Sequence, residues 1–559
     1  MFYAQNDDNL MNAILNGSYL GHTDSHAFFV NAPVSNVLQL LYSIVGWIPW
    51  YPLMLLAAIC LPLGVFVFRE KEKRDRLVLF ALFLPVFLPA LFGFTFTTAS
   101  AMLVLVGLGA FLLRREEVLF PSLCMAFAYC LRSEIFVVGC AFLLVAVLHR
   151  LLEREWKNVG KTLGCMVVLV AVFFGLNSLM YRSPQWQQYQ EVNEKRVGIY
   201  DYTWYVPYED APELYEKYDV SYEQYLLVDN YAMAMEAADW SQLLSKVDQI
   251  QIEYDGDYSL EGRLKRDPLL TLRVGFYRVR HTFADLFWPF GALVLALYGG
   301  LGIAILCSKR WLVVIPTACL LMGRTIIWMY LLLRGRFPDR VYLSICGMEC
   351  ILLAGMLWKL LPSVIWKKWG TIALAGACAL CGLWQGTTVI LQQVDHAKIE
   401  KSYEILYQYL EEHEDNTYLL DVRTMLGDTG KVLDFDTTQD NYFQLGGWIS
   451  ASPVLQERME QVALAEGIFA QTGQSALANG ISAQSDQSAQ LSEPATDKPV
   501  DGADLLRYGS RVYFVVEETR GMDWMSTYMA ARFPGTKMEV TERLAGEDRV
   551  FLICKVKGN

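Results

Sequence analysis

The sequence predicts a polytopic α-helical membrane bundle with a large external loop and a C-terminal external α/β domain. Three observations predict it: a 54% hydrophobic content with a mean hydropathy of +0.26, long apolar runs, and basic loops on alternate connections. A helix that crosses a bilayer needs about 20 apolar residues, and the chain supplies such runs repeatedly. The 559 residues are therefore expected to build a membrane protein rather than several soluble domains.

The apolar runs define the candidate membrane helices. They are 51–69, 77–97, 99–113, 118–131, 134–148, 162–181, 285–306, 311–333, 341–361 and 371–391. Three of these runs, 99–113, 118–131 and 134–148, are short for a bilayer. Each of the three is either partly re-entrant or part of a helix longer than its apolar run.

Lysine and arginine gather on every second connection between these helices. The basic connections are Arg69–Arg76, Arg114–Arg115, His149–Lys161, Lys309–Arg310 and Lys367–Lys368. The positive-inside rule places such loops in the cytoplasm. In a plasma membrane, the other connections, the N-terminal stretch and the chain beyond about residue 392 are then expected on the external side.

This alternation divides the chain into blocks. Residues 1–50 form an external acidic loop with an amphipathic helix, 51–181 and 285–391 the two groups of membrane helices, 182–284 a large external loop, and 392–559 an external α/β domain. Within the last block, the segment at about 470–500 is rich in Ala, Gln, Ser, Gly and Asp, which is typical of a flexible insert.

The N-terminal block is expected outside, although no signal peptide or helix precedes it. Either it is translocated unaided, or the chain lacks an upstream first helix. We favour the missing helix, because an export signal is otherwise absent. The net charge of −12 argues against nucleic acid as a partner.

An acidic pair, Asp7 and Asp8, stands ahead of the membrane helices. Carboxylates held at a membrane surface above a bundle can perform acid–base chemistry on lipid-linked substrates. Adjacent helical residues point about 100° apart, so one acid can face a substrate while the other accepts a capping hydrogen bond. The alternative is that both acids only cap the helix expected at Asn9–Leu15.

The following stretch carries His22, Asp24 and His26. Their spacing suits a metal ion, although such a pattern is common by chance in loops. Hydrogen bonding of His26 to a phosphate or sugar is at least as well supported. The sequence requires no cofactor and leaves a divalent metal open.

Arginines cluster at two external turns. Arg334, Arg336 and Arg340 follow the helix at 311–333 and depart from the positive-inside trend. Guanidinium groups suit phosphate oxygens, whereas anchoring at lipid headgroups accounts easily for one of the three. Arg132 and Glu134 lie at another external turn, where they either join the same site or pair with each other.

Two further charges, Arg324 and Glu349, lie within apolar runs. Each is about nine residues below the outer end of its helix, and so about 14 Å deep. Charges at that depth are costly unless paired. We expect a structural intramembrane pair rather than a direct role in substrate binding.

The acidic loop and the late arginine motif together resemble the GT-C superfamily of glycosyltransferases, polytopic enzymes that use polyprenyl-phosphate sugars. The resemblance rests on Asp7-Asp8, on the loop Gly17–His26 with an amphipathic helix behind it, and on Arg336-Phe337-Pro338-Asp339-Arg340 before an apolar span. A C-terminal external domain is also typical of such enzymes. The layout matches over nearly the whole chain, but the motifs are short.

The resemblance implies a function for these residues. Asp7 would be the catalytic base with Asp8 beside it, and Arg336 and Arg340 would bind the lipid phosphate. The chain would then transfer a sugar, with inversion, from a polyprenyl-phosphate donor to a glycan, lipid or protein acceptor at the external face. Two other classes stay open: a transporter or flippase of lipid-linked sugars, and a non-catalytic membrane protein with a binding tail.

Overall fold

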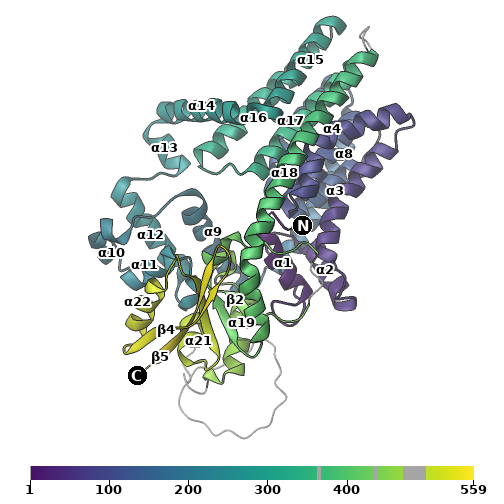
Figure 1. Ribbon diagram of the computed structural model, residues 1–559. Coiled ribbons are helices and arrows are strands. Elements are labelled where there is room, and N and C mark those ends of the chain that lie inside the picture. Colours follow the sequence, from purple (N-terminus) through teal and green to yellow (C-terminus); the bar gives the residue numbers. More distant parts are fainter. Residues whose placement is uncertain (1, 5, 362–366, 434–436, 470–498, 559) are drawn as a thin grey trace.

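The computed structural model describes residues 2–4, 6–361, 367–433, 437–469 and 499–558, with a helical bundle standing on a smaller α/β unit (Figure 1). Within these residues, nine helices have the length and apolar character to cross a membrane. The chain is therefore an integral membrane protein. This architecture confirms the predicted helical membrane bundle with a C-terminal α/β domain.

The spanning helices follow the predicted apolar runs closely. They are α3 (Trp50–Phe68), α4 (Lys73–Phe92), α5 (Phe96–Leu113), α7 (Ser133–Leu152), α8 (Trp156–Met180), α15 (Ala292–Ser308), α16 (Val314–Leu333), α17 (Asp339–Leu360) and α18 (Lys367–Glu412). Of the three short runs, two belong to the longer helices α5 and α7, because polar residues at their ends continue the helix. The third is the short helix α6 (Leu119–Leu131).

Helix α5 forms the centre of the bundle. Every residue of this helix except Leu113 is buried, against α3, α6, α7 and α17. A helix that is apolar on all sides is stable only where it is covered on all sides. Its N-terminus is consequently held at the mouth of the bundle, the end that faces the α/β unit.

Helix α18 is a single helix of 46 residues. The sequence analysis had divided this region into two blocks, a membrane span at 371–391 and an external domain from residue 392. They are continuous because no proline or glycine follows Gly386 within the helix. At 1.5 Å per residue the helix extends about 69 Å and carries the α/β unit on a rigid support.

The α/β unit is built on a five-stranded sheet. Its strands are β1 (Thr417–Leu420), β2 (Tyr442–Gln444), β3 (Val512–Glu517), β4 (Thr536–Ala545) and β5 (Val550–Gly558), in the order β2-β1-β3-β5-β4. β1 pairs in parallel with β2 and β3, whereas β5 pairs antiparallel with β3 and β4. The accompanying helices are α19 (Pro453–Ala465), α21 (Gly502–Tyr508) and α22 (Asp523–Arg532). The insert expected at about 470–500 lies almost wholly outside the described residues.

The segment 182–284 is helical and shares its core with the α/β unit. It contains α9 (Pro184–Val197), α10 (Pro212–Lys217), α11 (Tyr222–Asp229), α12 (Trp240–Asp255), α13 (Leu260–Arg266) and α14 (Pro268–Asp285). One apolar cluster joins Tyr215 and Leu227 of this segment to Leu419 and Phe514 of the sheet. Helix α14 departs from this arrangement, because it lies across the bundle against α16 (Figure 1).

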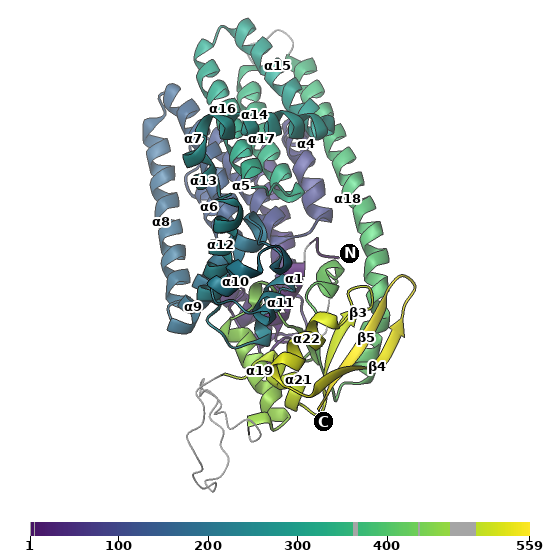
Figure 2. The same ribbon diagram turned by 90° about the vertical axis from the view of Figure 1, so that its left-hand side faces the viewer.

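Helix α1 (Asn6–Asn16) lies between the bundle and the α/β unit (Figure 2), and α2 (Ala32–Ile44) packs beside it against α3, α6 and α8. Hydrogen bonds fasten them to α3. The Tyr42 hydroxyl donates to Asn12 Oδ1 at 2.7 Å and accepts from the Tyr51 backbone N–H at 2.9 Å. Because all these groups are buried or partly buried, the position of α1 is fixed by the bundle itself.

Helices α16 and α17 are joined by a buried ion pair. Arg324 Nε lies 3.2 Å from Glu349 Oε2, and the Tyr298 hydroxyl donates to Glu349 Oε1 at 2.8 Å. The guanidinium of Arg324 lies 4.8 Å from the ring centre of Trp328. The expected partners are thus in contact, with hydrogen bonding and an aromatic face compensating for lost water.

Removing one member of this pair should destabilise the protein, because it leaves a lone buried charge. We expect Arg324→Leu or Glu349→Leu alone to cost about 3–5 kcal/mol, and the double variant to recover most of that loss. Thermal unfolding in detergent, followed by intrinsic fluorescence, measures the effect. Unchanged melting of both single variants would contradict a structural role for the pair.

Candidate active site

Helix α1 carries the acidic pair to the N-terminus of α5. Asp8 is fully buried, whereas Asp7 is half-buried. Asp8 Oδ1 accepts hydrogen bonds from the Tyr51 hydroxyl at 2.7 Å and from the Phe96 backbone N–H at 3.0 Å. Since Phe96 is the first residue of α5, Asp8 satisfies one of the unpaired N–H groups of that helix.

The burial of Asp8 also determines its protonation. Burial, the largest cause, and the charge of Asp7 raise the pKa of the Asp8 carboxyl, the hydrogen bonds from Tyr51 and Phe96 lower it, and the net pKa is about 8. The other oxygen, Oδ2, is buried and has no hydrogen-bond partner among the described residues. Asp8 is therefore mainly neutral at pH 7, and its contacts are those of a residue that fixes α1 to the bundle.

Asp7 has a different environment, in which cations gather. Burial raises the pKa of Asp7, and the charges of Arg340, Arg132 and Arg196 and the side chain of Trp448 oppose that shift. Partial desolvation makes the Asp7 carboxylate a stronger base, whereas the nearby arginines stabilise its charged form. Asp7 is thus the member of the pair that can exchange a proton with a bound molecule.

Arg340 lies in the first turn of α17 and is half-buried. Its guanidinium makes no ion pair or hydrogen bond with any residue that the structure describes, whereas Arg132 and Arg336 lie close enough to repel it. Asp7 and Asp8 are the acids whose charges act on it. An arginine with excess positive charge around it and no partner suits an anionic ligand.

Arg132 occupies the turn between α6 and α7. Its Nε lies 2.9 Å from Glu134 Oε2, and its guanidinium lies 5.0 Å from the ring centre of Phe29 and 5.1 Å from that of Phe96. The two outcomes expected from the sequence therefore coexist: Arg132 pairs with Glu134 and its charge also acts on Asp7.

Arg336 and Arg334 are engaged by the segment 182–284. Arg336 forms an ion pair with Asp201, and the guanidinium of Arg334 lies 3.7 Å from the ring centre of Tyr202. Of the two arginines that the resemblance assigns to a phosphate, Arg340 is the one whose charge is not already neutralised. The pair with Asp201 instead connects this segment to the start of α17.

The sequence analysis missed Arg196, a buried arginine of α9. It donates hydrogen bonds to Asn193 and to the Tyr231 hydroxyl. It forms no ion pair with any carboxylate that the structure describes. Its charge acts on Asp7. The available signal was helical spacing, because Arg196 continues the buried stripe that Trp186, Tyr189 and Val192 form on α9.

Trp448 is the second residue that the sequence analysis missed, and it comes from the α/β unit. Its ring lies 4.6 Å from Phe28 and 5.1 Å from Phe29, and its backbone carbonyl accepts from the Tyr189 hydroxyl at 2.8 Å. The preceding Gly446 admits no side chain, because a Cβ there would meet the Tyr231 carbonyl oxygen at 1.7 Å. The Gly446-Gly447 dipeptide was the available signal of this close approach.

The side chains of His22, Asp24 and His26 all contact other residues of the protein. His26 Nδ1 lies 2.8 Å from Asp24 Oδ1, and its ring stacks on Trp186 at 4.3 Å. His22 Nε2 lies 3.4 Å from Glu457 Oε1 of α19. Within the described ranges, no group of three or more His, Cys, Asp or Glu residues is arranged to hold a metal ion.

A small hollow of about 70 Å³ lies on another side of α1, against the carboxyl ends of β1 and β2. Asn6 and Asn9 of α1, Gln444 of β2 and the Tyr19 side chain contribute to its lining. The Tyr19 hydroxyl is buried and has no hydrogen-bond partner among the described residues. The amides and hydroxyls of this partly apolar lining suit hydroxyl-bearing molecules.

The fold and this arrangement define a class: an integral membrane protein with a basic carboxylate and several arginines at one mouth of its bundle. Two solved structures are similar, both of ArnT from Cupriavidus metallidurans, one in the apo state and one bound to undecaprenyl phosphate. Each alignment covers 99% of this chain and 92% of the other, at 15% and 13% identity, with a TM-score of 0.36. No family model matches the chain, and no curated protein matches it.

The protonation of Asp8 makes a prediction about stability. Asp8→Asn should melt close to the wild type below about pH 4, where the acid is neutral in both the folded and the unfolded chain, whereas Asp8→Ala orphans two buried donors at about 1–3 kcal/mol each. A raised pKa stabilises the folded state at low pH, and this contribution is lost as the pH rises from about 4 through about 8. Melting curves between pH 5 and 9 should therefore fall more steeply for the wild type than for Asp8→Asn. Parallel curves would contradict the assignment.

Proposed function

We propose that this protein is a membrane glycosyltransferase of the GT-C kind, which transfers a sugar from a polyprenyl-phosphate donor to an acceptor hydroxyl. The observation that carries the proposal is the half-buried Asp7 carboxylate at the mouth of the bundle, whose charge interacts with the unpaired guanidinium of Arg340. Glycosyl transfer from a phosphate needs these two groups, a base for the acceptor proton and a cation for the leaving phosphate. The resemblance of the acidic loop and of the late arginine motif supports the same activity.

In this proposal Asp7 is the general base. The acceptor oxygen attacks the anomeric carbon of the sugar from the face opposite the phosphate, and its proton moves to the Asp7 carboxylate. The bond between the anomeric carbon and the phosphate oxygen breaks in the same step, with inversion of configuration. A positioned base contributes typically about 10²–10⁴ in rate.

The arginines stabilise the leaving group. The bond electrons pass to the polyprenyl phosphate, which gains one negative charge. Arg340 has no protein partner to give up, so it binds these oxygens without breaking an ion pair, and Arg132 adds positive charge nearby. The lipid tail would lie along the apolar helices from which both arginines project.

The α/β unit would take part by presenting the acceptor, a glycan, lipid or protein. Its Trp448 reaches the environment of Asp7, and the hollow beside α1 is lined by groups suited to hydroxyls. The basic turns of the chain lie at the opposite end of the bundle, so the positive-inside rule favours an external site in a plasma membrane.

The first test is the substitution of Asp7. Asp7→Asn should abolish transfer, because an amide of the same shape cannot take the acceptor proton, while donor binding persists. The assay supplies membranes containing the protein with labelled polyprenyl-phosphate sugars and identifies any product. Asp8→Asn is the matched control and should keep most of the activity. Turnover by Asp7→Asn near the wild-type rate would reject the proposal. Loss of transfer in Asp8→Asn alone would instead make Asp8 the base and Asp7 the positioning residue.

The second test uses the pH dependence of the rate. A base acts when deprotonated, so the rate should rise with pH through the pKa of Asp7 and then level off. Arg340 lowers that pKa, so Arg340→Gln should shift the rise to higher pH as well as weaken donor binding. If Arg340→Gln binds the donor more weakly but its pH–rate profile does not shift, the charge of Arg340 does not act on Asp7.

A further inference from the structure

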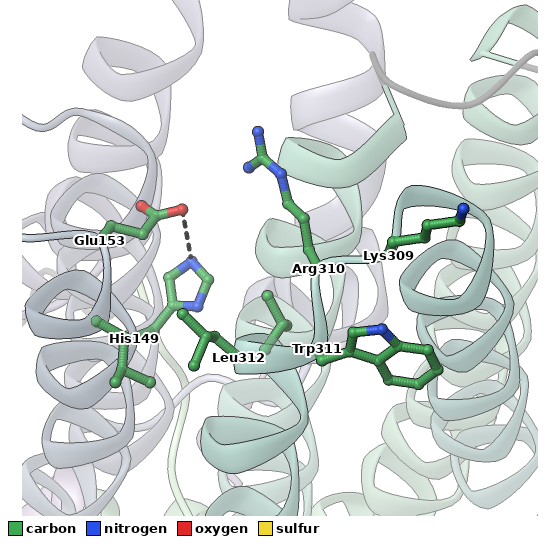
Figure 3. Close-up of a pocket in the computed structure, with 8 residues that line it drawn as sticks. His149, Glu153, Lys309, Arg310, Trp311 and Leu312 are labelled. Carbon is green, nitrogen blue, oxygen red and sulfur yellow. Dashed lines mark ion pairs between the residues drawn. The ribbon is translucent and has the colours of Figure 1, made fainter.

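A second pocket lies at the end of the bundle far from Asp7. It has a volume of about 430 Å³ and is formed between the C-terminal end of α7 and the turn that joins α15 to α16 (Figure 3). Its lining residues are His149, Leu152, Glu153, Lys309, Arg310, Trp311, Leu312 and Val313. Helix α7 separates it from Arg132 by its full 20 residues, about 30 Å, so it is distinct from the candidate active site.

The pocket has an excess of positive charge. Glu153 is already engaged, because Arg115 lies 2.6 Å and Lys359 3.1 Å from its Oε2 atom. Lys309 and Arg310 are exposed, and neither forms an ion pair or side-chain hydrogen bond with any other residue in the described part of the chain. The two basic side chains are thus available to an anion from outside the protein.

A buried histidine completes the polar wall. His149 is 3% exposed, and its Nε2 lies 3.6 Å from Glu153 Oε1, beyond hydrogen-bonding distance (Figure 3). Within the described residues this nitrogen has no hydrogen-bond partner. A buried imidazole nitrogen that lies near a carboxylate but makes no hydrogen bond is costly, and a ligand in the pocket could supply the missing hydrogen bond.

The remaining wall is apolar and opens toward the hydrocarbon region. Trp311 and Leu312 are 58% and 60% exposed, and Ile315 on the next turn is 46% exposed. Because α7 ends at Leu152 and α15 ends at Ser308, the pocket lies at the level where membrane helices meet water. An occupant of this pocket would therefore have one charged end and one apolar end.

We propose that this pocket binds an anionic phospholipid of the bilayer. The phosphate lies at the Arg310 guanidinium, with the headgroup within reach of His149 and Lys309 adding positive charge nearby, and an acyl chain runs along Leu312 toward Ile315. A pocket of this volume accommodates a headgroup, and basic pockets between membrane helices on the cytoplasmic side are suited to anionic lipids. The proposal is independent of the reaction assigned to Asp7.

Lipid binding to the purified full-length protein tests this site. Native mass spectrometry measures binding of phosphatidylglycerol and of phosphatidylcholine with the same acyl chains. We expect selective retention of phosphatidylglycerol, and about 25-fold weaker binding by Lys309→Asn/Arg310→Gln, since each basic residue contributes about a factor of five. Asparagine is chosen because Lys309 has a φ of 55°, a conformation that asparagine tolerates.

The matched control removes two charges from the same end of the bundle. Lys73→Gln/Arg74→Gln at the start of α4 lies outside the pocket and should bind phosphatidylglycerol like the wild type. Equal binding by the Lys309/Arg310 variant, or equal binding of the two lipids, would overturn the proposal. Full competition by glycerol phosphate at the same concentration would also overturn it, because the site would then recognise a soluble phosphate ester rather than a lipid.

Discussion

Burying two adjacent carboxylates at the N-terminus of α5 is the constraint on which the rest of the site depends. The two acids resolve it differently. Asp8 takes a proton and accepts hydrogen bonds from Tyr51 and Phe96, so that it ties α1 to the bundle as a neutral residue. Asp7 stays in reach of arginines from separate parts of the chain, which favour its charged form. One acid therefore fixes the position of α1, and the other is the one to which we assign the proposed chemistry.

The arginines reach Asp7 only because distant segments meet at the mouth of the bundle. Arg132 comes from a turn between membrane helices, Arg196 from the segment 182–284 and Arg340 from the start of α17. The α/β unit adds Trp448, which the rigid helix α18 and the close approach at Gly446 hold in place. The pocket at Lys309 lies at the opposite end, so the bundle separates a candidate reaction centre from a candidate lipid site.

Much of this architecture could be predicted from the sequence, because apolar runs and local motifs carry it. The membrane helices follow from hydropathy, the pairing of Arg324 with Glu349 follows from their matched depth, and Asp7, Asp8 and Arg340 were singled out by short local motifs. Arg196 and Trp448 could not be predicted in the same way, since their roles arise from contacts between segments far apart in the chain. The continuity of α18 was missed because polarity changes at about residue 392 while helix propensity does not.

The most direct test of the account is where a polyprenyl phosphate binds. A cryo-electron microscopy map of the full chain with this lipid should place its phosphate within hydrogen-bonding distance of the Arg340 guanidinium, with the Asp7 carboxylate facing the position of the sugar. The apolar tail should follow the membrane helices. A phosphate bound away from Arg340, with Asp7 closed off from it by protein atoms, would contradict the central claim that these two groups form one reaction centre.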